Sequence, residues 1–245
     1  TEIYTLSLHD ALPISLFTAD DGASGRELWR TDGTTAGTVL VKDIRPGPSG
    51  SDPGFMVALG SLALFSADDG ACGRELWASD GTPAGTVLVR DIWPGAAGGL
   101  AAGNLYSGPT RVGSRFAYFT AADGVRGLEL WRSDGTPGGT SLVMDIAAGA
   151  ADSYPEFLTL SGGRLLFRAK DAVNGQEPRV LFPGATAQAR GEAWPPSSTA
   201  SLAAGDPILG GLLQVRGRTG TTNRPLFLRA RTPAPPVRFP RGCPP

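Results

Sequence analysis

The chain has 245 residues, of which 41% are hydrophobic, and its formal net charge is −1. This length and composition suffice for one large all-β domain or for two ordinary domains with a buried core. The near-neutral charge argues against a protein that binds nucleic acid or an anionic membrane surface through bulk electrostatics, and no apolar run reaches the length of about 18 residues that a membrane span needs.

The first segment, residues 1–15, does not fit the pattern that begins at Leu16. It resembles translated adapter sequence, and we predict a non-native scar or remnant here. The alternative is a native half of a repeat unit, because spaced apolar residues occur between Ser7 and Leu16. The choice matters for chemistry, since His9 is the only histidine of the chain.

An internal repeat starts at Leu16. The segment Leu-Phe-Thr-Ala-Asp-Asp-Gly at residues 16–22 recurs, with small changes, at residues 64–70 and 118–124. Corresponding residues of the first two copies are 48 positions apart and those of the next two are 54 apart, the extra length lying in the Gly- and Ala-rich piece 94–108. A fixed period of this size is typical of arrays in which each repeat is one supersecondary unit.

Apolar clusters predict four short strands in each period, which in the second period are residues 55–59, 61–67, 74–79 and 86–92. Three consecutive apolar residues, 87–89, indicate a strand that needs cover on both faces, whereas a lone antiparallel sheet usually leaves one face in water. We therefore predict an all-β, β-propeller-like array of four-stranded antiparallel blades with a period of about 48 residues, forming an incomplete ring.

A fourth, eroded unit follows. Glu177 lies 48 residues after Glu129, but Arg179 stands where the other units have tryptophan, and no Asp-Gly-Thr sequence comes after it. We assign the repeat array to residues 16–182.

The remaining segment, residues 183–245, is rich in Arg, Pro, Ala and Gly. From Arg190 onward it contains eight arginines and two acidic residues. Faint repeats at 210–216 and 224–228 favour a degenerate terminal blade, and the biased composition favours a disordered or frame-shifted Arg/Pro-rich tail; both interpretations stay open. Clustered arginine in such a tail would attract anionic polymers.

Three units share the sequence Glu-Leu-Trp-x-x-Asp-Gly-Thr-x-x-Gly-Thr. Asp-Gly is a hairpin signal, because Gly accepts positive φ and the Asp side chain bonds backbone amides two residues on. The last Gly is predicted to supply a second positive-φ position, and the Trp to pack between blades, with stacking on sugars as the alternative. The predicted structural anchors are Trp29, Asp32, Gly33, Gly37, Trp77, Asp80, Gly81, Gly85, Trp131, Asp134, Gly135 and Gly139.

This pattern resembles the bacterial ELWxxDGT-repeat proteins, often labelled hyalin-like. The resemblance is close over residues 16–146 and partial over residues 161–179. It implies secreted or surface-attached β-propeller-like repeats, and it implies no particular reaction.

Acidic turns precede the Glu-Leu-Trp sequence in each of these units and raise a calcium hypothesis. Ca²⁺ takes six to eight oxygen ligands, which carboxylates and carbonyls at a Gly turn can supply. The spacing is not that of an EF-hand loop, and the competing interpretation is a set of structural turns with a solvated acidic rim. The candidate calcium ligands are Asp20, Asp21, Glu27, Asp68, Asp69, Glu75, Asp123 and Glu129.

The sequence indicates no catalytic residues. His9 lies in the segment set aside, so a Ser-His-Asp triad or a His-ligated zinc site lacks its usual central residue. Cys72 and Cys243 follow no metal or redox spacing. Acids that recur in every unit are expected to be structural, and the breaks in the repeat, including Asn104 and Tyr106 in the insertion, do not gather an acid, a base and a nucleophile.

We therefore expect a non-enzymatic, secreted or cell-surface repeat scaffold for binding or adhesion, with a protein or polysaccharide surface as partner and no nucleic acid. No cofactor is expected apart from the calcium of the hypothesis above. The alternative is a carbohydrate-active hydrolase or lyase with its site in the channel of a complete propeller.

Overall fold

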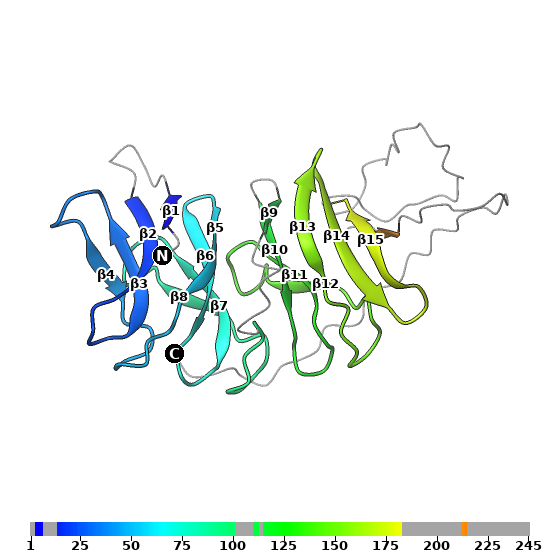
Figure 1. Cartoon of the computed structure of the whole chain (residues 1–245), viewed down its shortest axis with the longest axis horizontal. Coiled ribbons are helices and arrows are strands. Elements are labelled where there is room, and N and C mark those ends of the chain that lie inside the picture. Colours follow the sequence, from blue (N-terminus) through cyan, green and yellow to red (C-terminus); the bar gives the residue numbers. More distant parts are fainter. Residues whose placement is uncertain (1–2, 7–13, 101–109, 113–114, 183–211, 215–245) are drawn as a thin grey trace.

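The computed structural model describes residues 3–6, 14–100, 110–112, 115–182 and 212–214. Its regular structure is entirely β-strand, arranged as four four-stranded antiparallel sheets that follow one another in a row (Figure 1). The predicted all-β class with four-stranded antiparallel units is thus confirmed. Within the described ranges the chain forms no helix, and so none that could span a membrane.

Each strand pairs with its neighbours in the sequence, so every sheet is a simple meander. Sheet 1 consists of β1 (Ile3–Leu6), β2 (Ile14–Asp20), β3 (Arg26–Thr31) and β4 (Val39–Lys42). Sheet 2 consists of β5 (Gly54–Leu59), β6 (Leu62–Asp68), β7 (Arg74–Ser79) and β8 (Val87–Arg90). Sheet 3 consists of β9 (Thr110–Val112), β10 (Phe116–Ala121), β11 (Glu129–Ser133) and β12 (Ser141–Met144). Sheet 4 consists of β13 (Glu156–Ser161), β14 (Arg164–Asp171), β15 (Gly175–Leu181) and β16 (Leu212–Gln214).

The four strands predicted in the second period correspond to β5, β6, β7 and β8. The first three agree closely, but β8 ends at Arg90, two residues before the predicted end. The reason is that the backbone N–H of Ile92 donates to the Glu75 carboxylate instead of to a neighbouring strand. A buried side chain therefore decides where this strand stops.

In the second strand of each sheet, successive residues point to opposite faces of the sheet. Where two sheets are neighbours in the row, the facing side chains cover each other. We call the face that carries Leu64 the forward face of sheet 2, and the face that carries Phe65 its rear face. Leu64 packs with Phe119 of sheet 3, whereas Phe65 packs with Leu16 of sheet 1. A third cluster joins sheets 3 and 4 in the same way. The apolar run 87–89 predicted cover on both faces, and neighbouring sheets supply it for Val89 and Leu88, whereas Val87 is 46% exposed.

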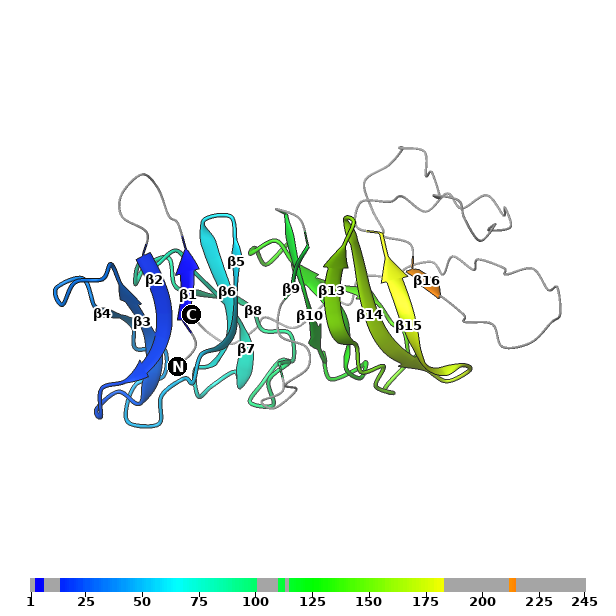
Figure 2. The same ribbon diagram turned by 45° about the horizontal axis from the view of Figure 1, so that its top comes forward.

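The first strands of the four sheets also contact one another in series. β1 lies against β5, β5 against β9, and β9 against β13. Figures 1 and 2 show the consequence from two directions: sheet 1 and sheet 4 are at opposite ends of the row, with sheets 2 and 3 between them.

Two strands come from segments that the sequence analysis set apart from the array. The backbone of β1, in residues 1–15, pairs with β2 in the register Ile3↔Phe17. β16 pairs with β15 through Val180↔Leu213 and completes sheet 4, so this short part of residues 183–245 belongs to the fourth unit. His9 and the arginines from Arg190 onward lie outside the described residues.

Candidate functional site

The Asp-Gly-Thr loop between β7 and β8 is held by hydrogen bonds among its own residues. Asp80 Oδ1 accepts from the backbone N–H of Thr82 at 2.8 Å and from the Thr82 hydroxyl at 2.7 Å. The Thr82 hydroxyl oxygen in turn accepts from the N–H of Gly85 at 3.0 Å. Gly81 has φ +85°, so the predicted turn glycine and the predicted Asp-to-amide bond both occur.

The same bonds recur in the other two units. The central Asp-to-Thr contacts are 2.9 and 2.7 Å in the first loop and 3.0 and 2.7 Å in the third. The Thr that ends each loop bonds back to the carbonyl oxygen of the loop's first Thr at 2.7 Å in all three units. The tips are exposed and consist of residues 34–36, 82–84 and 136–138. Each tip is therefore a surface feature whose backbone is fixed from below.

The prediction for the last glycine of the loop is wrong in its physical reason. Gly37, Gly85 and Gly139 do not have positive φ. They are required because the Asp carboxylate lies against the backbone: a Cβ on Gly85 would be 2.1 Å from Asp80 Oδ1, far inside contact distance.

The Glu of each Glu-Leu-Trp sequence is fully buried and binds the backbone of the connection to the next sheet. Glu75 accepts hydrogen bonds from the N–H groups of Ile92 and Trp93, both at 3.0 Å, and from that of Gly99. Glu27 repeats this arrangement at the same sequence offsets of 17, 18 and 24, accepting from the N–H groups of Ile44, Arg45 and Ser51. Glu129 has partners at the same offsets, the N–H groups of Ile146 and Ala147 and the hydroxyl of Ser153. Each glutamate therefore fixes one connection between sheets.

Burial governs the ionisation of two of these glutamates. It raises the pKa of Glu75 to about 8, although the three N–H donors act in the opposite direction. It also raises the pKa of Glu129 to about 7, against the hydrogen bonds from Ser153, Ile146 and Ala147. These carboxyl groups change charge near neutral pH inside the protein.

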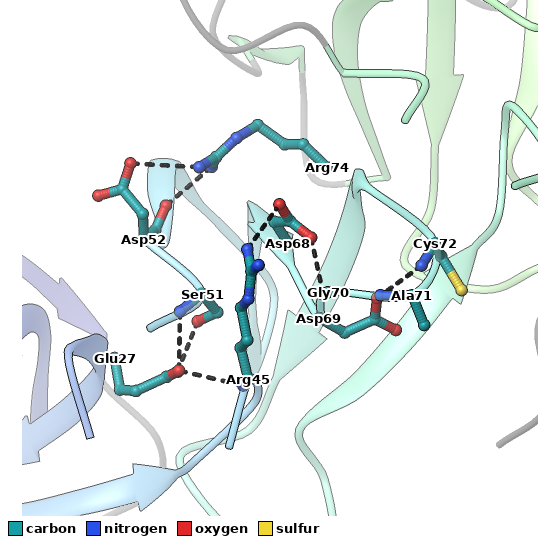
Figure 3. Close-up of polar contacts among 10 residues, drawn as sticks. All are labelled: Glu27, Arg45, Ser51, Asp52, Asp68, Asp69, Gly70, Ala71, Cys72 and Arg74. Atoms are coloured by element: carbon teal, nitrogen blue, oxygen red, sulfur yellow. Dashed lines mark hydrogen bonds and ion pairs between the residues drawn. The ribbon is translucent and has the colours of Figure 1, made fainter. Parts of the chain in front are cut away.

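Figure 3 shows the junction between sheets 1 and 2, where Glu27 and the next acidic turn share one arginine. The backbone N–H of Arg45 donates to Glu27, and its guanidinium pairs with Asp68 at 3.1 Å. The Ser51 hydroxyl and N–H complete the contacts to Glu27. The junction thus holds two sheets together through residues that the sequence alone offered as calcium ligands.

The aspartates of the acidic turns bind the turns themselves. Asp21 Oδ1 accepts from the N–H groups of Ala23 and Ser24, and Asp69 Oδ1 from those of Ala71 and Cys72. Asp20 accepts from Gly22.

In the third unit the turn aspartate, Asp123, binds Val125 and Arg126. The described residues contain no group of three or more His, Cys, Asp or Glu side chains placed to hold a metal ion. The eight candidate calcium ligands are therefore not brought together, and calcium binding stays a hypothesis.

The tryptophans of the second and third units are buried between sheets. Trp77 lies in the cluster between sheets 1 and 2, and Trp131 in that between sheets 2 and 3. A cation from the preceding sheet covers each ring: Lys42 Nζ is 5.9 Å from the Trp77 centroid, and the Arg90 guanidinium carbon is 6.0 Å from that of Trp131. These two rings are not placed to stack on a sugar, whereas Trp29, on the rear face of sheet 1, is half-buried.

In the fourth unit an ion pair stands in place of the tryptophan. Arg179 is buried, and its guanidinium contacts Asp171 Oδ2 at 2.7 Å and the carbonyl oxygen of Ala169. Burial raises the pKa of Asp171, but the hydrogen bonds from Arg179, Asn174 and Val173 outweigh it and hold the pKa well below its usual range. Of the other break in the repeat, the insertion 94–108, the part with Asn104 and Tyr106 lies outside the described residues.

Comparisons with known proteins give little further information. No family model matches the chain, and no curated protein matches it. Among solved structures, the chain is similar to the crystal structure of a puromycin hydrolase S511A mutant complexed with PGG, with a TM-score of 0.47 and 13% sequence identity. The similarity covers 74% of this chain and 26% of the other, so this chain spans about a quarter of that protein's length.

Proposed function

We propose that this chain is part of a β-propeller-like, non-enzymatic scaffold that binds a protein or polysaccharide surface outside the cell. The propeller-like arrangement is supported by the contacts of first strand with first strand, β1 to β5 to β9 to β13, and by sheets that pack face to face. Four-stranded blades around a common axis have both features. The extracellular location rests on the resemblance to ELWxxDGT-repeat proteins.

The observation that carries the proposal is the use of the repeated acids. Glu27, Glu75 and Glu129 are buried and accept backbone N–H groups, and the turn aspartates bind their own turns. Acids used in this way build a rigid frame, because each one removes freedom from a connection.

The surface available for binding is the set of loop tips at residues 34–36, 82–84 and 136–138, which we call the loop rim. Each tip has the same internal bonds beneath it, so a ligand that binds the rim meets a backbone that is already ordered. Preorganisation of this kind lowers the entropic cost of association. Neighbouring loops are also tied across sheets, since Arg30 donates to the carbonyl oxygen of Gly81 at 3.0 Å.

The test is to incubate the chain with immobilised polysaccharides of differing charge and to follow both retention and release of reducing ends or unsaturated products. A scaffold is retained and releases nothing. Substitution of the exposed Pro83 and Pro137 by Glu is expected to weaken retention on neutral and anionic polysaccharides, while Val173→Glu, a control at an exposed site away from the rim, leaves it unchanged.

Release of products at a rate that follows protein concentration would overturn the proposal in favour of the carbohydrate-active enzyme. Retention that the rim variants do not alter would move the binding surface elsewhere.

A further inference from the structure

The forward face of sheet 4 exposes residues that are buried at the same positions in the other sheets. Leu166 is 40% exposed, whereas its equivalents Leu16, Leu64 and Tyr118 are 0, 0 and 1% exposed. The difference arises because each of those three packs against the rear face of a following sheet.

Exposed apolar side chains are concentrated in this unit. Five of the nine large hydrophobic residues that the described part of the chain exposes belong to it: Tyr154, Phe157, Leu160, Leu166 and Val173. Phe157 is 55% exposed, and its ring lies 4.9 Å from the guanidinium carbon of Arg168. Because β14 alternates, Arg168 shares the forward face with Leu166. Leu166 and Phe157 thus expose apolar surface beside Arg168, whereas Leu160 is paired with Leu165 of the rear face and Val173 lies in the β14–β15 turn. Exposed apolar surface on an otherwise covered face marks an interaction site.

The rear face of sheet 1 is the matching half of the same interface. Ala19 and Trp29 on this face are only half-buried. The equivalent alanines, Ala67, Ala121 and Ala169, are completely buried, each against the forward face of the preceding sheet. The two ends of the row are therefore a forward face and a rear face. Faces of these two kinds pack against each other at the three interfaces within the chain.

We propose that the forward face of sheet 4 binds the rear face of sheet 1 in a second copy of this chain, continuing the stacking of sheets 1 to 4 from one molecule to the next. Such a contact is heterologous, so it either closes a ring or extends a chain of molecules. Two copies supply eight sheets, which lies within the four to eight blades common in propellers. The closure into a ring depends on the propeller-like arrangement proposed above, whereas the association does not.

The first experiment is the mass of the intact chain in solution by light scattering after size exclusion, at concentrations up to about 100 µM. We expect twice the 25.3 kDa of one chain, or a higher multiple. A wild-type chain that stays at 25.3 kDa over this range overturns the proposal, because the exposed face then has another occupant.

Two variants disable one face each. Leu166→Glu places a charge on the forward face of sheet 4, and Ala19→Arg places a long charged side chain on the rear face of sheet 1. Each variant alone is expected to run at the monomer mass, while Val173→Glu, at a residue 87% exposed in the β14–β15 turn, keeps the wild-type mass. Unchanged circular dichroism and melting temperature of the variants show that the fold is intact.

Mixing the two variants gives the decisive result. Each retains the face that the other lacks, so a mixture is expected to form a dimer although neither variant does alone. A mixture that stays monomeric overturns the proposal. The proposal is also overturned if Leu166→Glu is monomeric while Ala19→Arg still associates. That result would require the forward faces of sheet 4 in two copies to bind each other.

Discussion

The carboxylate of Glu75 in β7 holds the backbone N–H of Ile92, 17 residues later, at 3.0 Å. The same offset separates Glu27 from Ile44 and Glu129 from Ile146. The glutamate that gives the repeat its recognisable sequence is thus the residue that ends the fourth strand and fixes the path to the next sheet.

Replacing Glu75 by alanine should therefore be strongly destabilising. It leaves three N–H groups without their acceptor, those of Ile92 and Gly99 buried and that of Trp93 half-buried, and each buried group costs about 1–3 kcal/mol. We expect the free energy of unfolding in urea to fall by at least about 2 kcal/mol, and Asp43→Ala, at an exposed aspartate, to change it little. A loss for Glu75→Ala as small as that of the control would show that water or a shifted loop replaces the carboxylate.

Stability should also fall as the pH rises through neutrality. The pKa of Glu75 is raised from 4.5 to about 8 in the folded protein, so between these values the folded state binds more protons than the unfolded state. The unfolding free energy should fall between pH 5 and 8 by a few kcal/mol, since one unit of pKa corresponds to about 1.4 kcal/mol.

Urea titrations at several pH values, on the wild type and on Glu75→Gln, measure this slope. The glutamine variant should lose part of the pH dependence, and Glu129 accounts for a further part because its pKa is also raised. A wild-type free energy that rises over this interval would mean that the N–H donors outweigh burial and keep Glu75 ionised.

The glycine at the end of each loop can be tested by a double substitution. A Cβ on Gly37 would lie 1.9 Å from Asp32 Oδ1, so Gly37→Ala should destabilise the protein by about 2 kcal/mol, and Asp32→Ala in the same chain should relieve part of that loss. Gly33 is the control, because its φ is +91° and no atom lies near the position of a Cβ. The cost of Gly33→Ala is therefore backbone strain, which Asp32→Ala does not relieve. Equal coupling for both glycines would contradict the steric explanation.

Calcium is expected to leave the protein unchanged. The turn carboxylates hold their own turns, as Asp21 does by accepting from Ala23 and Ser24, and the described carboxylates form no group of three that could supply the six to eight ligands of Ca²⁺. The melting temperature in millimolar CaCl₂ should therefore equal that in millimolar MgCl₂, with no calcium-specific heat in calorimetry. A calcium-specific rise that Asp21→Asn and Asp69→Asn abolish would restore the calcium hypothesis.

The sequence by itself determined the architecture of the unit. A period of 48 residues, apolar clusters of strand length and Asp-Gly turns are local signals, and the structure has the predicted β7 at residues 74–79 and the predicted positive φ at Gly81. These features depend on residues close together in the chain, where spacing alone decides which groups meet.

Only the tertiary structure decided what the acids do and which faces remain open. The sequence offered Glu75 only as a candidate calcium ligand. Its actual partners lie 17 to 24 residues away and are backbone N–H groups, which no sequence pattern distinguishes. The sequence predicted a positive φ at Gly85, whereas the glycine is required because the Asp80 side chain folds back onto the loop and leaves no space for a Cβ. Leu166 occupies the same position in its unit as Leu64, and their exposure differs because sheet 3 packs on Leu64 while none of the other described sheets packs on Leu166. Burial depends on what packs against a residue, and that is a property of the assembled sheets.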